Sequence, residues 1–269
     1  MVQVRGMGVL GVARRVVGVS RDRNITFLAA SVAYYGFVSL LPLLLLVVAV
    51  GSLVGGEAFA QLVVRQIQGV LSESGREVVH MALTNSEGRT GAGVASVVVL
   101  TWGALRLFRG LSLAFAEAYG TPGEPSLVGQ VVDGAVTVAL LGLTVGLLVA
   151  VGYVVGLSGV VDALPYSGVV ATLGLFVGLV VAFLPLYYVL PPITVSLGEA
   201  LPGAAFAAAG WVVLEVGFGI YAANAGQYQA YGILGAVLLL VTWLYFAGLA
   251  FLVGAVVNAV LAGQTSGES

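Results

Sequence analysis

The chain has 269 residues, of which 60% are hydrophobic and only 8% are charged. Soluble domains carry about 25% charged residues, so this composition predicts an all-α integral membrane protein. The net charge of −2 gives no reason to expect a nucleic-acid partner. The absence of cysteine and the single histidine exclude disulfides, thiolate metal sites and a multi-histidine metal centre within one chain.

The first 23 residues are basic, with five arginines among short apolar stretches. A secretory signal would have one brief apolar core and a cleavage site before soluble sequence. Because this segment leads directly into a full-length membrane span, we interpret residues 1–23 as a short amphipathic helix at the cytoplasmic membrane surface.

Six segments are each long and apolar enough to cross a bilayer, which requires about 20 mainly apolar residues. They cover residues 25–55, 92–118, 128–157, 168–190, 200–223 and 230–262. Proline, glycine and polar residues at 121–126 and 191–199 mark two of the breaks. We predict one transmembrane domain over residues 24–263, a bundle of six helices, followed by a cytoplasmic tail at 264–269.

The arginines orient this bundle. An even number of spans puts both termini on one side, and the basic segment before the first span predicts that this side is the cytoplasm. Arg106 and Arg109, towards the inner end of the second span, agree with that. We therefore expect a multi-pass protein of a prokaryotic inner membrane.

The first outer loop, residues 56–91, is the only sizeable soluble piece. Its apolar residues between 59 and 71 recur at helical spacing, and Ser74 with Glu77 fits a capping box that opens a second short helix. Two amphipathic helices are predicted there, either as a lid or as a cover over helix ends.

A polar stripe lies inside the first span. Ser31, Tyr35, Ser39 and Pro42 follow at spacings of four, four and three, hence on one helix face, and Tyr34 adjoins them. Proline leaves the carbonyl four residues earlier without its helical partner, and in lipid that carbonyl must face protein or water. The stripe therefore points inwards, either to hydrogen-bond neighbouring helices or to line a pathway.

Buried charge is a second candidate feature. Arg106 and Arg109 share a face of the second span, and Glu215 lies in the fifth span at a similar depth, so Arg106 and Glu215 are able to pair. Such a group serves either as a structural ion pair or in function. Tyr231 and Asn258 add polar groups to the last span and complete the candidate polar seam.

Enzymatic functions are disfavoured. Metal-assisted hydrolysis needs clustered carboxylates or histidines, whereas the acidic residues here are scattered, and the phosphate-binding GxxxxGK[ST] motif is missing from the sequence. We therefore expect no catalytic residues, no metal and no cofactor.

Small residues form stripes at spacings of three and four in two of the spans. Such stripes let helix backbones approach closely, either within the bundle or between subunits of a homo-oligomer. They are Ala135, Ala139, Gly142, Gly146 and Ala150 in the third span, and Gly174 and Gly178 in the fourth.

Four stretches together resemble the YihY/virulence factor BrkB family of membrane proteins. They are RNITFLAASVAYYGFVSLLPLLL, TWGALRLFRGLSLAFAEAYG, YYVLPPITVSLGEALPGAAFAAAGW and YGILGAVLLLVTWLYFAGLAFLVGAVVNAVLAG, and they follow the family order. The resemblance implies six spanning helices. Members once carried the label ribonuclease BN, which is regarded as a misassignment, and relatives are linked to export of envelope lipids or glycans and to serum resistance.

Two positions depart from the family pattern. Val256 stands where the last span commonly has glutamate, which leaves Asn258 alone in that motif. The connection at 191–199, often basic in relatives, contains no arginine here. A family mechanism that relies on that glutamate, or on headgroup binding by that loop, is therefore in question for this chain.

The leading hypothesis is a transporter or flippase-like exporter of an amphiphilic, lipid-linked or envelope-related substrate, with membrane lipids as its surroundings. The alternatives are a non-transporting scaffold that organises partner proteins, and an uncoupled channel. Kinked spans, small-residue packing and buried charge all suit alternating access.

Overall fold

The computed structural model describes residues 8–39, 108–121, 167–223 and 232–264, together with positions 129, 132, 134, 136, 139 and 146. The chain divides into two compact units, one of Met1–Ala33 with Phe108–Ser269 and one of Tyr34–Leu107. Almost all of the described residues belong to the first unit. The predicted outer loop at 56–91 lies outside the described residues.

All regular secondary structure in the described part of the chain is helical, which confirms the predicted fold class. The helices are α1 (Val9–Asp22), a helix at Ile25–Ser39, a helix over 108–119, α6 (Ser167–Val189), α7 (Leu197–Ala223) and α8 (Gly232–Leu261). Segments of three of them, Gly168–Val189, Leu197–Ile220 and Val237–Leu261, are long and apolar enough to cross a membrane. Each of the six predicted spans contains described helical residues.

The helix α7 begins three residues earlier than the predicted fifth span, inside the predicted break. Its first turn is a capping box: the Ser196 backbone N–H and hydroxyl both donate to a Glu199 carboxylate oxygen at 2.8 Å, and the Glu199 N–H faces the Ser196 hydroxyl. These bonds satisfy polar groups that the start of a helix otherwise leaves bare. The sequence Ser-Leu-Gly-Glu is therefore a helix start within the loop.

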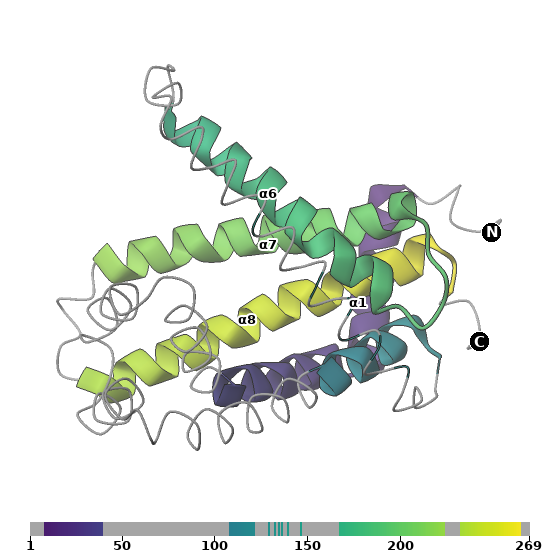
Figure 1. Ribbon diagram of the computed structural model, residues 1–269, viewed down its shortest axis with the longest axis horizontal. Coiled ribbons are helices and arrows are strands. Elements are labelled where there is room, and N and C mark those ends of the chain that lie inside the picture. Colours follow the sequence, from purple (N-terminus) through teal and green to yellow (C-terminus); the bar gives the residue numbers. More distant parts are fainter. Residues whose placement is uncertain are drawn as a thin grey trace, which may run out of the picture. The chain divides into compact units, whose positions relative to one another are not determined.

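Buried residues of the three long helices gather at one end of the first unit. They come from the C-terminal part of α6, the N-terminal part of α7 and the C-terminal part of α8, which converge in Figure 1. The opposite halves of these helices carry exposed apolar side chains, such as Val169, Leu173, Val213 and Ile220. Among the described residues of these three helices, burial is therefore concentrated at one end.

Small residues build the contact between α7 and α8. Ala200, Ala204, Ala207 and Ala208 of α7 are fully buried, as are Ala255 and Ala259 of α8. A Cβ on Gly210 would lie 2.6 Å from the Ala250 side chain, so the backbones approach closely here. Gly174, in one of the predicted stripes, instead has nothing within 4 Å of its Cβ position. It makes no such contact with the residues that the structure describes.

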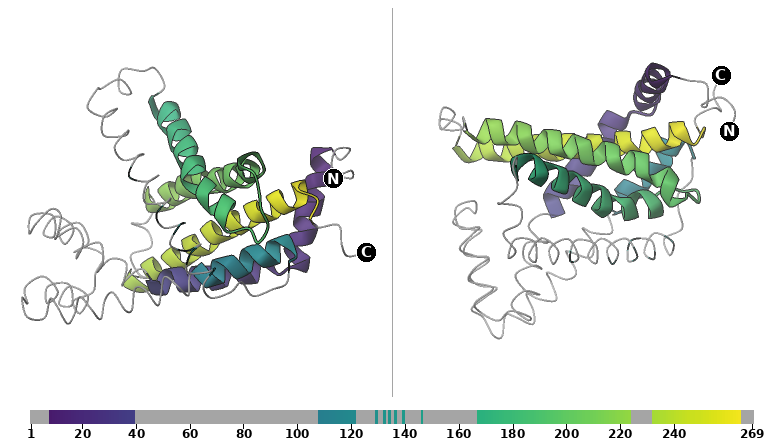
Figure 2. Two further views of the ribbon diagram at one scale, coloured as in Figure 1. Left: turned by 45° about the vertical axis from the view of Figure 1, so that its right-hand side comes forward. Right: turned by 90° about the horizontal axis from the view of Figure 1, so that it is seen from above.

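The helix α1 runs across α8 rather than along it (Figures 1 and 2). Val16 of α1 is buried in the core, and Val12 and Val19 pack against it. Asn24 adopts the left-handed conformation, with φ of 50°, which turns the chain from α1 into the helix at Ile25–Ser39.

Candidate functional site

The closest approach of the long helices is between Gly203 of α7 and Gly254 of α8. A Cβ on Gly203 would overlap the Gly254 carbonyl oxygen, and a Cβ on Gly254 would overlap the Gly203 carbonyl oxygen and the Tyr187 hydroxyl. Glycine is therefore required at both positions for this geometry. We call this place the α7–α8 crossing and define it by Gly203, Gly254 and Asn258.

Asn258 ties the two helices together at the crossing. Its Oδ1 accepts a hydrogen bond from the Gly203 backbone N–H at 2.6 Å, and its Nδ2 donates to the Ala200 carbonyl at 3.1 Å. The side chain is only 2% exposed. A polar side chain in such surroundings is stable only when its groups are paired, and both are. Of the predicted seam, Asn258 is the residue whose contacts the structure defines best.

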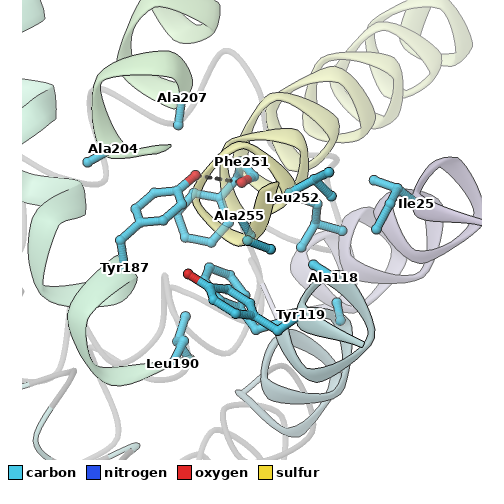
Figure 3. Packing of buried hydrophobic residues seen from close by; sticks show 14 of the residues in the cluster. Ile25, Ala118, Tyr119, Tyr187, Leu190, Ala204, Ala207, Phe251, Leu252 and Ala255 are labelled. Atoms are coloured by element: carbon cyan, nitrogen blue, oxygen red, sulfur yellow. Dashed lines mark hydrogen bonds between the residues drawn. The ribbon is translucent and has the colours of Figure 1, made fainter. Parts of the chain in front are cut away.

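Aromatic side chains from three helices surround the crossing. The Tyr187 hydroxyl of α6 donates to the Phe251 carbonyl of α8, as Figure 3 shows. The rings of Tyr187 and Phe251 lie 4.9 Å apart, and Phe115 lies 5.6 Å from Tyr187 and 5.5 Å from Phe251. Ring separations in this range are favourable beyond simple burial. The triangle joins α6, α8 and the helix over 108–119.

Tyr119, one residue past the predicted second span, extends this polar group. Its side chain is buried, with an exposed fraction of 1%. Burial raises the pKa of Tyr119 to about 12, the Asn258 side chain opposes the rise, and the Glu199 carboxylate adds to it. The phenol is therefore neutral at physiological pH.

Arg23 caps the C-terminus of the helix over 108–119 at the same end of the unit. Its guanidinium Nη1 donates to the Glu117 carbonyl at 3.0 Å and to the Ala118 carbonyl at 2.7 Å, the last turn of the helix over 108–119. That helix ends at Gly120, where φ is 66° and a Cβ would overlap the guanidinium. A cation at a helix C-terminus satisfies bare carbonyls and complements the helix dipole.

A small pocket of about 200 Å³ opens beside the crossing, where α7 begins and α8 ends. Pro202 has no N–H, so the Gly198 carbonyl loses its regular helical donor at this place. The Glu199 carboxylate and Asn258 also line the pocket. Across the described ranges, no group of three histidine or acidic side chains is arranged to hold a metal. The pocket lining is Gly198, Glu199, Pro202, Asn258, Leu261, Ala262 and Gly263.

The first-span stripe is described as far as Ser39. The Ser31 hydroxyl donates to the Phe27 carbonyl of its own helix at 3.2 Å rather than to another helix. Ser31, Tyr35 and Ser39 are half-buried, whereas Tyr34 is 62% exposed. The Tyr34 and Tyr35 rings meet edge to face at 5.5 Å. The buried face of this helix is formed instead by Ile25, Ala29 and Ala33, and the stripe lies beside it. Pro42 lies outside the described residues.

The predicted charges lie in different surroundings. Arg109 is half-buried in the first turn of the helix over 108–119, and Glu215 is exposed on α7. Arg106 and Tyr231 lie outside the described residues, so pairing of Arg106 with Glu215 stays a prediction. Val256, at the position where relatives commonly have glutamate, is fully buried in the core.

Tyr119, Tyr187, Arg23 and the two glycines of the crossing were not predicted as site residues. Two signals were present in the sequence: the capping box at 196–199, and tyrosines at helix ends in otherwise apolar surroundings. The pairing of Gly203 with Gly254 had no such signal, because the chain contains 39 glycines.

Comparison with known proteins places these features in a family context. A profile described as virulence factor BrkB matches residues 16–269. A UPF0761 membrane protein of Azoarcus sp. is 29% identical over 87% of this chain and 59% of its own length, and one of Aeromonas salmonicida is 27% identical over 88% and 84%. A ribonuclease-like protein, YfkH, of Bacillus subtilis is 34% identical over 31% of this chain and 30% of its own length.

The matches to YfkH and to the Azoarcus protein cover less than two thirds of the length of each of these relatives. No solved structure matches the chain.

Proposed function

The chain belongs to the virulence factor BrkB family of membrane proteins, and we propose that it is a non-enzymatic, flippase-like exporter of an amphiphilic, lipid-linked or envelope-related substrate. The observation that supports this most is the uneven packing of α6, α7 and α8. Their buried residues lie at one end, and their other halves carry exposed apolar side chains. One state of an alternating-access cycle requires a bundle that is closed at one end only.

The chemistry of the less packed halves suits an amphiphile. Val213, Val216 and Ile220 offer apolar surface on one face of α7, and the exposed carboxylate of Glu215 lies on another face of the same half of the helix. A carboxylate at this depth costs at least about 2.5 kcal/mol unless it meets a partner or water. A substrate with both an acyl chain and a polar head would use both kinds of group.

Prolines supply bending points next to the packed end. Pro185 lies inside α6 and Pro202 inside α7. Each removes one helical hydrogen bond and crowds the preceding turn, and such places absorb changes in helix direction. Both therefore lie where α6 and α7 would have to bend if the packed end opened.

We further propose that the packed end is cytoplasmic and that the protein resides in a prokaryotic inner membrane. The basic helix α1 lies against α8, which agrees with the excess of arginine expected on that side. Because the chain lacks cysteine, Gln264→Cys and Asn85→Cys give clean single labels in intact cells. A membrane-impermeant maleimide should label Asn85→Cys alone; labelling of Gln264→Cys alone would reverse the orientation.

Reconstitution into liposomes tests the transport proposal. We expect the purified protein to speed the movement of a headgroup-labelled fluorescent lipid between leaflets, measured by reduction of the outer-leaflet dye. Glu215→Gln should slow this movement, whereas Thr242→Val, an exposed change on α8, should not. Solute flux without lipid movement would favour an uncoupled channel. Rates equal to those of empty liposomes for both would refute transport.

A non-transporting scaffold is the second candidate. The N-terminal half of α6 is exposed nearly all round, including Val169, Leu173 and Val177, and such a surface also fits a partner helix. Site-directed photo-crosslinking from Leu173 in cells distinguishes the two. Crosslinking to one specific protein, combined with absent transport, supports the scaffold.

A further inference from the structure

The helix α1 has two apolar faces, and only one of them is packed. Val12, Val16 and Val19 lie against the core. Leu10 and Val17, on another face, are 84% and 51% exposed. One apolar face suffices to hold a helix on a protein. The second face therefore calls for a different partner.

Basic side chains share this exposed face. Leu10, Arg14, Val17 and Arg21 follow at spacings of four, three and four, so they form one stripe along the helix. Arg14 and Arg21 are both exposed. No acidic residue falls on the stripe, because Asp22, the one acidic residue of α1, lies about 100° away from Arg21. The stripe alternates apolar and positively charged groups.

The stripe is held in a fixed place. Val16 is buried in the core, and the chain after α1 turns sharply at Asn24 with φ of 50°. Between them, Arg23 donates hydrogen bonds to the Glu117 and Ala118 carbonyls. The orientation of α1 is therefore set by the bundle rather than by a flexible tether.

The level of α1 along the bundle corresponds to a membrane surface. It runs across α8 (Figure 2) and packs on it, and α8 has 30 residues. Such a helix is about 45 Å long, whereas a bilayer hydrocarbon core is about 30 Å thick. Its ends therefore reach the headgroup regions, where a crossing helix lies in the membrane plane.

We propose that the exposed stripe of α1 binds anionic phospholipid headgroups. Arg14 and Arg21 contact headgroup phosphates, while Leu10 and Val17 insert at the acyl boundary. Arginine suits phosphate because its planar guanidinium donates two parallel hydrogen bonds. Alternating arginine and aliphatic residues match a surface that is charged above and apolar below. This binding does not depend on the proposed transport activity.

Spin labels on the full-length chain test the insertion. Leu10→Cys and Val17→Cys should be more accessible to oxygen than to a water-soluble nickel complex in nanodiscs that contain phosphatidylglycerol. Asp22→Cys, exposed on another face, is the matched control and should show the reverse. Equal accessibility at the three positions would refute insertion. If dipolar broadening of the label at Leu10→Cys grows with protein density, the stripe contacts a second copy of the chain and the lipid proposal is wrong.

Charge substitutions test the headgroup. The mobility of a label at Leu10→Cys should fall as the phosphatidylglycerol fraction rises in phosphatidylcholine nanodiscs. In the double variant Arg14→Gln/Arg21→Gln, the apparent lipid affinity should drop on the order of tenfold or more. The variant Arg14→Lys/Arg21→Lys keeps the charge and should retain most of the response. Identical titrations for the glutamine variant and the parent would overturn the proposal.

Discussion

Replacement of Asn258 by leucine tests whether one side chain holds α7 and α8 together. Leucine has the same number and branching of heavy atoms but makes neither bond, so the Gly203 N–H and the Ala200 carbonyl lose their side-chain partner. Side-chain hydrogen bonds between membrane helices average only about 0.6 kcal/mol, with a maximum near 1.7 kcal/mol. Two average bonds would therefore contribute about 1.2 kcal/mol.

The loss at Asn258 should exceed this average. Asn258 is only 2% exposed, so water has little access to the vacated position, and removal of one hydrogen-bond partner at a buried site costs about 1–3 kcal/mol. We therefore expect a loss of about 2 kcal/mol for Asn258→Leu. For a domain of this size, that loss lowers the melting temperature by on the order of 5 °C.

The assay is the melting temperature of the detergent-solubilised protein, followed by size-exclusion chromatography after heating. Thr242→Val is the matched control, because Thr242 is also polar and on α8 but bonds only to the Leu238 carbonyl of its own helix. We expect that control to melt within about 1 °C of the parent, since exposed substitutions rarely exceed about 0.5 kcal/mol. If Asn258→Leu and the control have the same melting temperature, the α7–α8 crossing does not depend on this side chain.

Three further changes probe the same end of the bundle. Gly254→Ala should destabilise more than Asn258→Leu, because its Cβ overlaps the Gly203 carbonyl and the helices must separate; unchanged thermal stability would contradict the close approach. Tyr187→Phe removes the hydrogen bond to the Phe251 carbonyl and should lower the free energy of unfolding by about 1 kcal/mol. A loss as large as that for Gly254→Ala would show that the Tyr187 hydroxyl does more than make this one bond. Arg23→Gln should loosen α1, detected as faster proteolysis between α1 and the first span, whereas Thr242→Val should leave the cleavage rate unchanged.

The helices themselves were predictable because lipid leaves few choices. A backbone in hydrocarbon must satisfy its hydrogen bonds within one segment, so α6, α7 and α8 were readable from length and composition alone. The helix α7 begins three residues before the approximate start of the predicted fifth span, for a local reason. The polar sequence around Ser196 and Glu199 was interpreted as a loop, although its capping box begins the helix.

The contacts between helices were not predictable, for a reason specific to membranes. The long helices are apolar all round, so the sequence does not indicate which face of each turns inwards. Nothing local distinguishes Gly203 and Gly254 from other glycines, and their pairing depends on aligning segments about 50 residues apart. Asn258 was singled out because it remains in the last-span motif in which Val256 replaces the family glutamate, and its two hydrogen bonds were not predicted. The amphipathic helix α1 was predictable for the opposite reason, because its charged residues distinguish its polar face from its apolar faces.

The bonds at the packed end also rank the helix contacts by strength. Two hydrogen bonds of Asn258 and a direct backbone approach join α7 to α8. Among the described residues, α6 packs mainly along α7, where the Phe183 and Trp211 rings lie 5.3 Å apart. It reaches α8 through the Tyr187 hydroxyl and through ring contacts with Phe251. Lipid provides no hydrophobic drive between helices, so bonds and close packing decide which contact is weaker. In the proposed transport cycle, we therefore expect the α7–α8 contact to be the last of these to open.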